Sequence, residues 1–298
     1  MYLTHSCICV MLTKIGNISI GYNHCPRVMG IINLSPESFY KKSIKLNSDE
    51  IQNTVLDMQS SGVDIIDIGG MSTAPYLKTF IPIDLEIERL QYAVSAIRQI
   101  SDIPISVDTV RSDVLESLLK YDINAVNDVT GLKYDKKMPL TVSESNLPVI
   151  IGAYRSNSNS SNPFTGDVYD TINLLVESID IAASYKIKGE GVIIDPSIGF
   201  FRKIGNNPFF SKIDGMDWYI RDINILSNIS LLSSLHKPVC ISVSRKSFMG
   251  SLLNLNLEER LIPSIITEIH CVLNGVSLIR THNVKETKLA VNMIGILN

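Results

Sequence analysis

The chain has 298 residues, of which 45% are hydrophobic and 19% are charged, and its formal net charge is −3. This composition is typical of a globular protein with a sizeable core, and the charge gives no reason to expect nucleic acid or an anionic membrane as a partner. No apolar run approaches the roughly 20 residues that cross a bilayer, and no basic region marks a signal peptide.

The five cysteines are odd in number and show no CxxC pair or zinc-type spacing. Cys7 and Cys9, which are separated by one residue, form only a weak metal signal. We therefore expect a reduced chain in the cytoplasm. Residues 1–13 are predicted to be an N-terminal tail, with Met11 as a second candidate start, and residues 14–298 a single domain.

Eight short apolar runs predict eight strands. Such continuous Val/Ile-rich runs are typical of parallel strands buried on both faces. Helix-like segments separate them, which indicates repeated strand–helix units. The predicted strands cover residues 27–33, 64–70, 104–108, 124–128, 148–153, 191–195, 238–244 and 276–282.

The intervening helices carry their own start and stop signals. Ser48 is a candidate N-cap and Gly62 a candidate stop for the first helix, and Asn283 with Glu286 forms a variant of the capping box at the last. Apolar residues at helical spacing predict the buried faces of the first three helices. These are Ile51, Val55 and Met58, then Ile87, Leu90, Val94 and Ile97, then Val114, Leu115, Leu118 and Leu119.

Eight strand–helix units without a linker-like break predict a (β/α)8 TIM barrel. Residues 13–23 predict a short N-terminal β-hairpin that plugs the barrel floor. A doubly wound open sheet is the alternative, although no GxGxxG follows the first strand. Residues 154–163 are polar and of low complexity, and predict a mobile loop, with a catalytic lid as the second interpretation.

Polar residues end several of the strands. Asp108, Asn127 with Asp128, and Asp195 are expected to meet at one mouth, because barrel strands present their carboxyl ends together. Carboxylates and an amide around an apolar pocket suit a flat heterocycle with N–H donors and a carbonyl. Each acid could instead cap the helix that follows it. Asp67, in contrast, is placed inside its strand.

Cationic residues follow the last two strands. Arg245 and Lys246 are expected to bring positive charge to the same mouth, and an exposed basic turn is the alternative. Arg280 and His282 share one side of the eighth strand, beside a helix start, and predict a phosphate site. Asn33 ends the first strand, where its amide oxygen can bind a ligand or Mg²⁺, or serve only a turn.

Seven segments in this order resemble the dihydropteroate synthase family. They are "VMGIINLSPESF", "DIIDIGGMST", "SVDT", "NAVNDVTG", "IIDPSIGF", "SRKSFMG" and "RTHNVKET", and the resemblance runs from about residue 14 to the C-terminus. It implies a transferase that joins 6-hydroxymethyl-7,8-dihydropterin pyrophosphate to p-aminobenzoate and releases pyrophosphate. The family's mechanism passes through a pterin methylene cation, which is stabilised electrostatically.

The resemblance also implies roles for individual residues. The implied catalytic residues are Lys246, Asp108 and Asp195. The implied pterin-binding residues are Asp108, Asn127, Asp195 and Lys246. The implied pyrophosphate-binding residues are Asn33, Thr73, Arg280 and His282, with Ser72 nearby, and Asn33 is also the implied ligand of the cofactor Mg²⁺. Phe200 and Ser247 are implied to lie beside the arylamine. A homodimer is expected, with residues 261–275 as one candidate face.

The resemblance breaks down in the loops. The family's ESTRP is replaced by Met71-Ser72-Thr73-Ala74-Pro75, which lacks the Glu and the Arg. Lys41 stands where an Asp is usual in the first loop, and Gly152-Ala153-Tyr154-Arg155 replaces a Met-His pattern. Lys41, Lys42 or Arg155 could supply the missing positive charge.

These departures leave alternatives open. The amine could be a ribosylated aminobenzene phosphate rather than p-aminobenzoate. The chain could also be a catalytically degenerate pterin-binding paralogue. A pterin-dependent methyltransferase on the same barrel is a further alternative, although such an enzyme has no need of the SRK and R-x-H anion groups.

Overall fold

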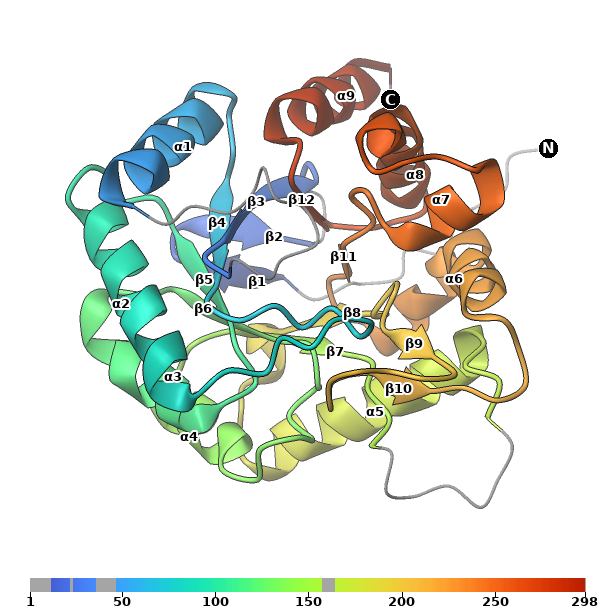
Figure 1. The fold of residues 1–298 in the computed structure, drawn as a ribbon, viewed down its shortest axis with the longest axis horizontal. Helices are drawn as coiled ribbons and strands as arrows, with labels where there is room; N and C mark the ends of the chain where they lie inside the picture. Colours follow the sequence, from blue (N-terminus) through green and yellow to red (C-terminus); the bar gives the residue numbers. More distant parts are fainter. Residues whose placement is uncertain (1–11, 22–23, 36–46, 157–163, 298) are drawn as a thin grey trace.

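The computed structural model describes residues 12–21, 24–35, 47–156 and 164–297, and within them eight strands form one parallel sheet, whose arrangement Figure 1 shows. The strand order is β11-β12-β3-β4-β5-β6-β7-β8. A bridge between Ile194 and Val239 joins the two ends, which closes the sheet into a barrel. The strands are β3 (Arg27–Asn33), β4 (Ile65–Gly69), β5 (Ile105–Asp108), β6 (Ala125–Asp128), β7 (Val149–Gly152), β8 (Val192–Asp195), β11 (Cys240–Ile241) and β12 (Leu278–Thr281).

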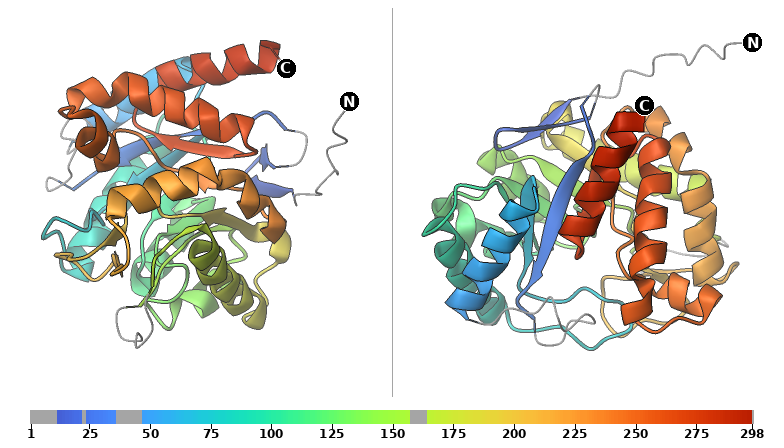
Figure 2. Two further views of the ribbon diagram at one scale, coloured as in Figure 1. Left: turned by 90° about the vertical axis from the view of Figure 1, so that its right-hand side faces the viewer. Right: turned by 90° about the horizontal axis from the view of Figure 1, so that it is seen from above.

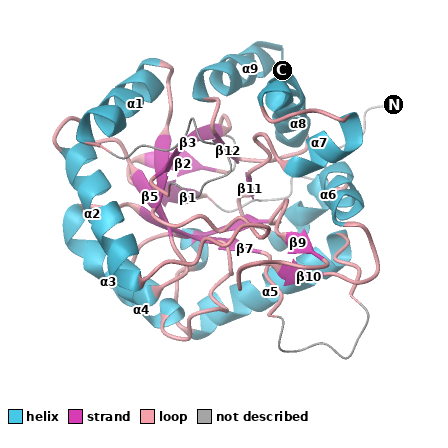
Figure 3. Ribbon diagram, viewed as in Figure 1, coloured by secondary structure: helices cyan, strands magenta, loops and turns pink. Residues whose placement is uncertain are grey.

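Helices surround the barrel as an outer ring (Figure 3). They are α1 (Ser48–Ser60), α2 (Ile83–Arg98), α3 (Ser112–Leu118), α4 (Met138–Ser145), α5 (Val168–Ser184), α6 (Trp218–Ser227), α7 (Ser247–Leu253), α8 (Leu261–Leu273) and α9 (Val284–Leu297). Short 3-10 segments cover Leu119–Tyr121, Gly189–Gly191, Ile229–Leu235 and Glu258–Arg260. The predicted TIM barrel is confirmed. No helix in the described ranges is both long and apolar enough to cross a membrane.

A hairpin of β1 (Thr13–Ile15) and β2 (Ile18–Ile20) closes one end of the barrel. Ile15 and Ile20 are fully buried there, in a cluster with inward-facing residues of seven barrel strands. Those residues are Met29, Ile65, Ala125, Ile150, Ile193, Cys240 and Leu278. The predicted plug of the barrel floor is confirmed, and Figure 2 shows the hairpin at the end opposite the loop that follows β4.

Three local predictions about the helices are wrong. Asn47, not Ser48, caps α1, because its side chain accepts a hydrogen bond from the backbone N–H of Glu50. Leu119 is exposed, since α3 ends before it and the chain tightens into a 3-10 turn. The side chain of Asn283 bonds to Arg245 and Ser244 instead of capping α9.

The segment between β8 and α6 carries two strands that the sequence did not indicate. β9 (Phe201–Arg202) and β10 (Ser211–Lys212) pair in parallel, with Phe201 opposite Ser211. This small sheet extends beyond the carboxyl end of β8, so its side chains are placed over the mouth of the barrel. The predicted loop at residues 154–163 lies largely outside the described residues, which resume at Phe164.

Candidate active site

A pocket opens at the carboxyl ends of the barrel strands and contains most of the predicted site. Eight of the ten predicted residues line it: Asn33, Thr73, Asp108, Phe200, Lys246, Ser247, Arg280 and His282. Asn127 pairs in register with Asp108 on the neighbouring strand, and Asp195 ends β8. Another cavity lies at the floor end against β1 and contains none of the predicted residues.

Two buried carboxylates share one guanidinium at the base of this pocket. Arg280 donates from Nε to Asp67 at 2.6 Å and from Nη2 to Asp108 at 2.8 Å. Asp67 also accepts a hydrogen bond from the side-chain amide of Asn127 at 3.2 Å. Asp67 is therefore part of the site, a role that was not predicted because this residue lies inside its strand and not at the strand end.

Each of the two carboxylates keeps one oxygen available. Oδ1 of Asp67 and Oδ1 of Asp108 are buried and have no hydrogen-bond partner within the described residues. Burial raises the pKa of Asp108 to about 7, with Arg280 opposing the rise and Asp67 adding to it. Buried acceptors without donors are costly, so these oxygens suit a ligand that brings N–H groups.

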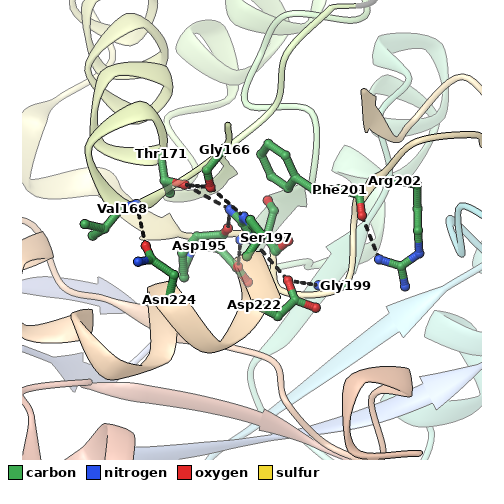
Figure 4. A network of polar contacts seen from close by, with 12 residues as sticks. Gly166, Val168, Thr171, Asp195, Ser197, Gly199, Phe201, Arg202, Asp222 and Asn224 are labelled. Atoms are coloured by element: carbon green, nitrogen blue, oxygen red, sulfur yellow. Dashed lines mark hydrogen bonds and ion pairs between the residues drawn. The ribbon is translucent and has the colours of Figure 1, made fainter. Parts of the chain in front are cut away.

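Asp195 is held by the turn that follows β8. Its Oδ1 accepts from the backbone N–H of Ser197 at 2.7 Å, and burial raises the pKa of its carboxyl group. Arg221 on α6 donates to the carbonyls of Pro196 and Ser197, while Asp222 accepts from the backbone of Gly199 (Figure 4). The turn that carries Asp195 is thus fixed from behind.

This Arg221–Asp222 pair is fully buried and was not predicted from the sequence. The two side chains are 3.2 Å apart and each has a relative exposure of 0%. The stretch "WYIRDINIL" did contain a signal, since two adjacent charges interrupt a largely apolar helix. Buried charges of this kind are normally paired, so they mark a helix face turned toward polar backbone.

Lys246 lies between the base of the pocket and its rim. Its Nζ is 4.8 Å from the centroid of the Phe200 ring. Burial and then Arg280 lower the pKa of Lys246 to about 8, against the opposing effect of Asp195. Gly199, with φ of +85°, lets the chain pass close to it, because a Cβ there would lie 3.1 Å from Cδ of Lys246.

Arg245, the other cation of the SRK segment, does not line the pocket, so the prediction that it brings positive charge to the mouth is wrong. Arg245 has φ of +54°, which turns its side chain away from that of Lys246. Its guanidinium donates to the carbonyls of Leu257 and Glu258 and to the side chain of Asn283. Arg245 therefore fixes the loop before α8.

His282 and Arg280 both line the pocket, as their spacing predicted. Nδ1 of His282 lies 3.1 Å from the hydroxyl of Ser244. Burial, followed by the charges of Arg280 and Lys246, lowers the pKa of His282 well below its ordinary value. The imidazole is therefore neutral at pH 7 and acts as a hydrogen-bonding group.

The loop after β4 is tied to the segment after β8. Asn206 donates from its backbone to the carbonyl of Pro75 and from its side chain to that of Tyr76, and Asn207 donates to Ala74. Ser72 and Thr73 line the pocket, and the hydroxyl of Thr79 donates to the Ser72 carbonyl. The rewritten loop therefore has a defined position without its usual Glu and Arg.

Two further expectations are resolved by local contacts. Asp128 has the structural role left open for the strand-end acids, since it accepts hydrogen bonds from Thr130 and from the backbone of Leu132. Arg155 stacks 4.2 Å over the ring of Phe164 and does not line the pocket. Lys41 and Lys42 lie outside the described residues.

Comparison with known proteins gives matches along nearly the whole chain. The family described as "Pterin binding enzyme" matches residues 29–282. A dihydropteroate synthase of Clostridium beijerinckii is 30% identical over 285 residues, covering 95% of this chain and 98% of the relative. That of Bacillus subtilis is 29% identical over 281 residues, covering 94% and 92%.

Solved structures agree with these matches. A dihydropteroate synthase of Clostridium difficile, determined in the presence of pteroic acid, has 31% identity and a TM-score of 0.79, with 93% of this chain and 98% of that chain covered. That of Coxiella burnetii, in complex with pteroic acid, has 29% identity and a TM-score of 0.79, covering 96% and 98%.

Proposed function

This chain belongs to the pterin binding enzyme family, alongside the dihydropteroate synthases, and we propose that it joins 6-hydroxymethyl-7,8-dihydropterin pyrophosphate to p-aminobenzoate. The product is dihydropteroate, and pyrophosphate is released. The observation that carries this proposal is the pair of buried carboxylate oxygens, on Asp67 and Asp108, that have no hydrogen-bond partner among the described residues and lie under a pocket edged by Lys246. The relatives bound to pteroic acid support it, since pteroic acid joins a pterin to p-aminobenzoate.

The site residues act by binding and by electrostatics. Asp108, Asn127 and Asp195 hold the polar edge of the pterin, and the ammonium of Lys246 donates to an acceptor on its ring. The bond between the pterin methylene carbon and the pyrophosphate oxygen breaks, and the arylamine nitrogen bonds to that carbon and loses one proton. Buried carboxylates favour the cationic methylene carbon, because charge stabilisation is strong where water is excluded.

The departing pyrophosphate is placed near the residues that end β3, β4 and β12. Arg280, His282, Asn33 and Thr73 all line this part of the pocket. Arg280 keeps its positive charge because Asp67 and Asp108 raise the pKa of its guanidinium, in spite of its burial. The neutral His282 adds a hydrogen bond rather than a charge.

The residues of this pocket fit a Mg²⁺ ion that is coordinated by the protein and the substrate together. A Cβ built on Gly69 would lie 3.8 Å from Oδ1 of Asn33 and 3.9 Å from Oδ2 of Asp108, so both oxygens lie next to the carboxyl end of β4, the latter bonded to Arg280. The described residues contain no cluster of three metal-binding side chains, and Mg²⁺ is commonly held by one or two protein oxygens together with phosphates. Asn33 would hold the ion, which would offset the charge of the leaving pyrophosphate.

A homodimer and a cytoplasmic location complete the proposal. The apolar residues of α8 and α9, two neighbouring helices (Figure 2), support the dimer, because seven large side chains on them are more than half exposed. We call this the α8–α9 surface: Ile262, Ile266, Leu273, Leu289, Met293, Ile296 and Leu297. Apolar patches of this kind typically mark interfaces. The free thiols of Cys25, Cys240 and Cys271 support the location.

The test is pyrophosphate release from the dihydropterin pyrophosphate with Mg²⁺. p-Aminobenzoate and the ribosylated aminobenzene phosphate would be supplied in parallel. Release with p-aminobenzoate that is lost in Lys246→Ala, but kept in the exposed control Lys203→Ala, supports the proposal. Binding of the pterin substrate without release with either amine would overturn it and favour a non-catalytic pterin-binding protein, as the loss of the loop Glu and Arg would suggest.

A further inference from the structure

Arg202 is a buried cation that the predicted site does not include. It is 6% exposed, yet it lines the pocket together with Phe200 and Ser247. Within the described residues it forms no ion pair, because the nearby Asp222 is paired with Arg221. A buried charge is costly without an opposite charge, so the position of Arg202 calls for an anionic ligand.

Three contacts with described residues fix the guanidinium of Arg202, and only two of them are hydrogen bonds. Cζ lies 3.8 Å from the centroid of the Trp218 ring, which supports the flat face of the group. Nη1 donates to the carbonyl of Phe201 at 2.7 Å, and Nη2 donates to the hydroxyl of Ser247 at 3.0 Å. A guanidinium has five N–H groups, so three form no hydrogen bond within the described residues and can bind a ligand. The fork is thus oriented before a ligand arrives.

The location of Arg202 distinguishes it from the pyrophosphate residues. Arg202 is on β9, beyond the end of β8, whereas Arg280 is within β12 and bonds to the two acids at the base. Tyr76, in the loop after β4, lines the same pocket; burial raises the pKa of its phenol, and the charge of the nearby Arg202 opposes that rise. Arg202 therefore lies at the rim, where the far end of a second substrate would be expected.

We propose that Arg202 recognises the carboxylate of the arylamine substrate, with the hydroxyl of Ser247 beside it. This inference rests on the proposed function. The aromatic ring would lie against Phe200, its amine would point to the base of the pocket, and its carboxylate would meet the guanidinium edge. Arginine binds carboxylates in a two-pronged geometry that lysine cannot match. The chain would thus use the segment after β8 to supply a cation where Ala74 replaces the family's loop arginine.

The test compares p-aminobenzoate with 4-aminobenzamide, which keeps the ring and the amine but lacks the charge. Pyrophosphate release is measured for the natural protein, Arg202→Met, Arg202→Lys and the control Lys203→Met, whose side chain is exposed and pairs with Asp217. We expect Arg202→Met to raise the KM for p-aminobenzoate by about 10- to 100-fold, the usual range for losing a charged hydrogen bond. The KM for 4-aminobenzamide should change by less than about 3-fold.

The outcomes separate the possible roles. Arg202→Lys should keep part of the preference for the charged amine, and Lys203→Met should keep all of it. Equal losses with both amines would overturn the proposal and leave Arg202 a structural role. A rise in the KM for the pterin pyrophosphate alone would also overturn it, because Arg202 would then bind phosphate. If circular dichroism shows that Arg202→Met does not fold, Arg202→Lys provides the test. An unchanged preference for p-aminobenzoate over 4-aminobenzamide in Arg202→Lys would then overturn the proposal. Absence of release by the natural protein would instead refute the proposed function.

Discussion

Asp67 and Arg280 meet at 2.6 Å although 213 residues separate them in the chain. Their contact joins β4 to β12 across β3 and fixes the guanidinium that also binds Asp108. The positive charge of the pocket is thus held in place by Asp67, a residue that was predicted to lie inside its strand and was not assigned to the site.

Replacing Asp67 should therefore destabilise the protein. Asp67→Ala leaves Arg280 with one carboxylate and Asn127 without its acceptor, and we expect a loss of about 3–5 kcal/mol in unfolding free energy. Guanidinium unfolding would measure it, with the exposed Asp57→Ala as a control expected to stay within about 0.5 kcal/mol. A change in Asp67→Ala no larger than in the control would contradict this role.

Deprotonation of Lys246 should lower the activity at high pH. Since its pKa is lowered to about 8, the protonated form that donates to the pterin is lost as the pH rises through that value. We expect kcat/KM for the pterin substrate to fall above about pH 8, because this ratio reports ionisations of the free enzyme. Lys246→Arg keeps its charge and should remove that step from the profile. A fall at the same pH in Lys246→Arg would assign the step to another group.

Replacing one member of the buried Arg221–Asp222 pair should destabilise the protein more than replacing both. Arg221→Met leaves buried Asp222 without its partner and frees the carbonyls of Pro196 and Ser197, so we expect about 3–5 kcal/mol of destabilisation and a raised KM for the pterin. The double variant Arg221→Met/Asp222→Leu should recover part of the stability but not the KM, because the turn that carries Asp195 stays unsupported. Equal stability of the single and double variants would argue against this account.

Glu268 should make stability depend on pH. It is fully buried on α8, accepts from Thr287 at 2.7 Å, and burial raises its pKa from 4.5 to about 7. Its folded-state pKa lies above the unfolded value, so the stabilisation is present below pH 4.5 and is lost as the pH rises to 7 and beyond. Relative to Glu268→Gln, the natural protein should lose about 3 kcal/mol across this window. Parallel curves for both proteins in urea unfolding would refute this.

The α8–α9 surface gives a test of the proposed dimer. Ile266 is 64% exposed, so Ile266→Lys should leave the folded subunit intact but separate the dimer, because it places a charge in an apolar interface. Light scattering coupled to size exclusion measures the mass. Leu56→Lys, a similarly exposed position on α1, is the matched control and should remain dimeric. A monomeric natural protein, or a dimeric Ile266→Lys, would contradict the proposal.

The barrel could be predicted from the sequence because its strands are buried on both faces. The predicted strand at residues 27–33 coincides with β3, and the others differ mainly at their ends. The largest difference is β11, which covers only Cys240–Ile241 of the predicted residues 238–244. The convergence of Asp108 and Asn127 also followed from the fold, since all strand ends of a barrel meet at one mouth.

The remaining features depend on contacts that a local pattern cannot encode. Lys246 and Arg245 are adjacent and both basic, and only a left-handed backbone at Arg245 decides which one enters the pocket. The charge of Asp67 within an apolar strand is visible in the sequence, but its partner, Arg280, is 213 residues away and cannot be identified from the local pattern. Arg202 was not singled out, since its place at the rim depends on the pairing of β9 with β10.

The order in which the chain is made has a consequence for how the barrel closes. β12 pairs with β3, so Leu278 lies beside Arg27 and the partner strand is synthesised 251 residues later. At a synthesis rate of about 5–20 residues per second, one edge of β3 stays unpaired for roughly 13–50 seconds before β12 has been made. This unpaired edge belongs to the apolar segment "VMGII", and exposed edges of this kind pair readily with other chains. Ribosome-bound chains should therefore need protection at β3 until the final helix–strand unit emerges.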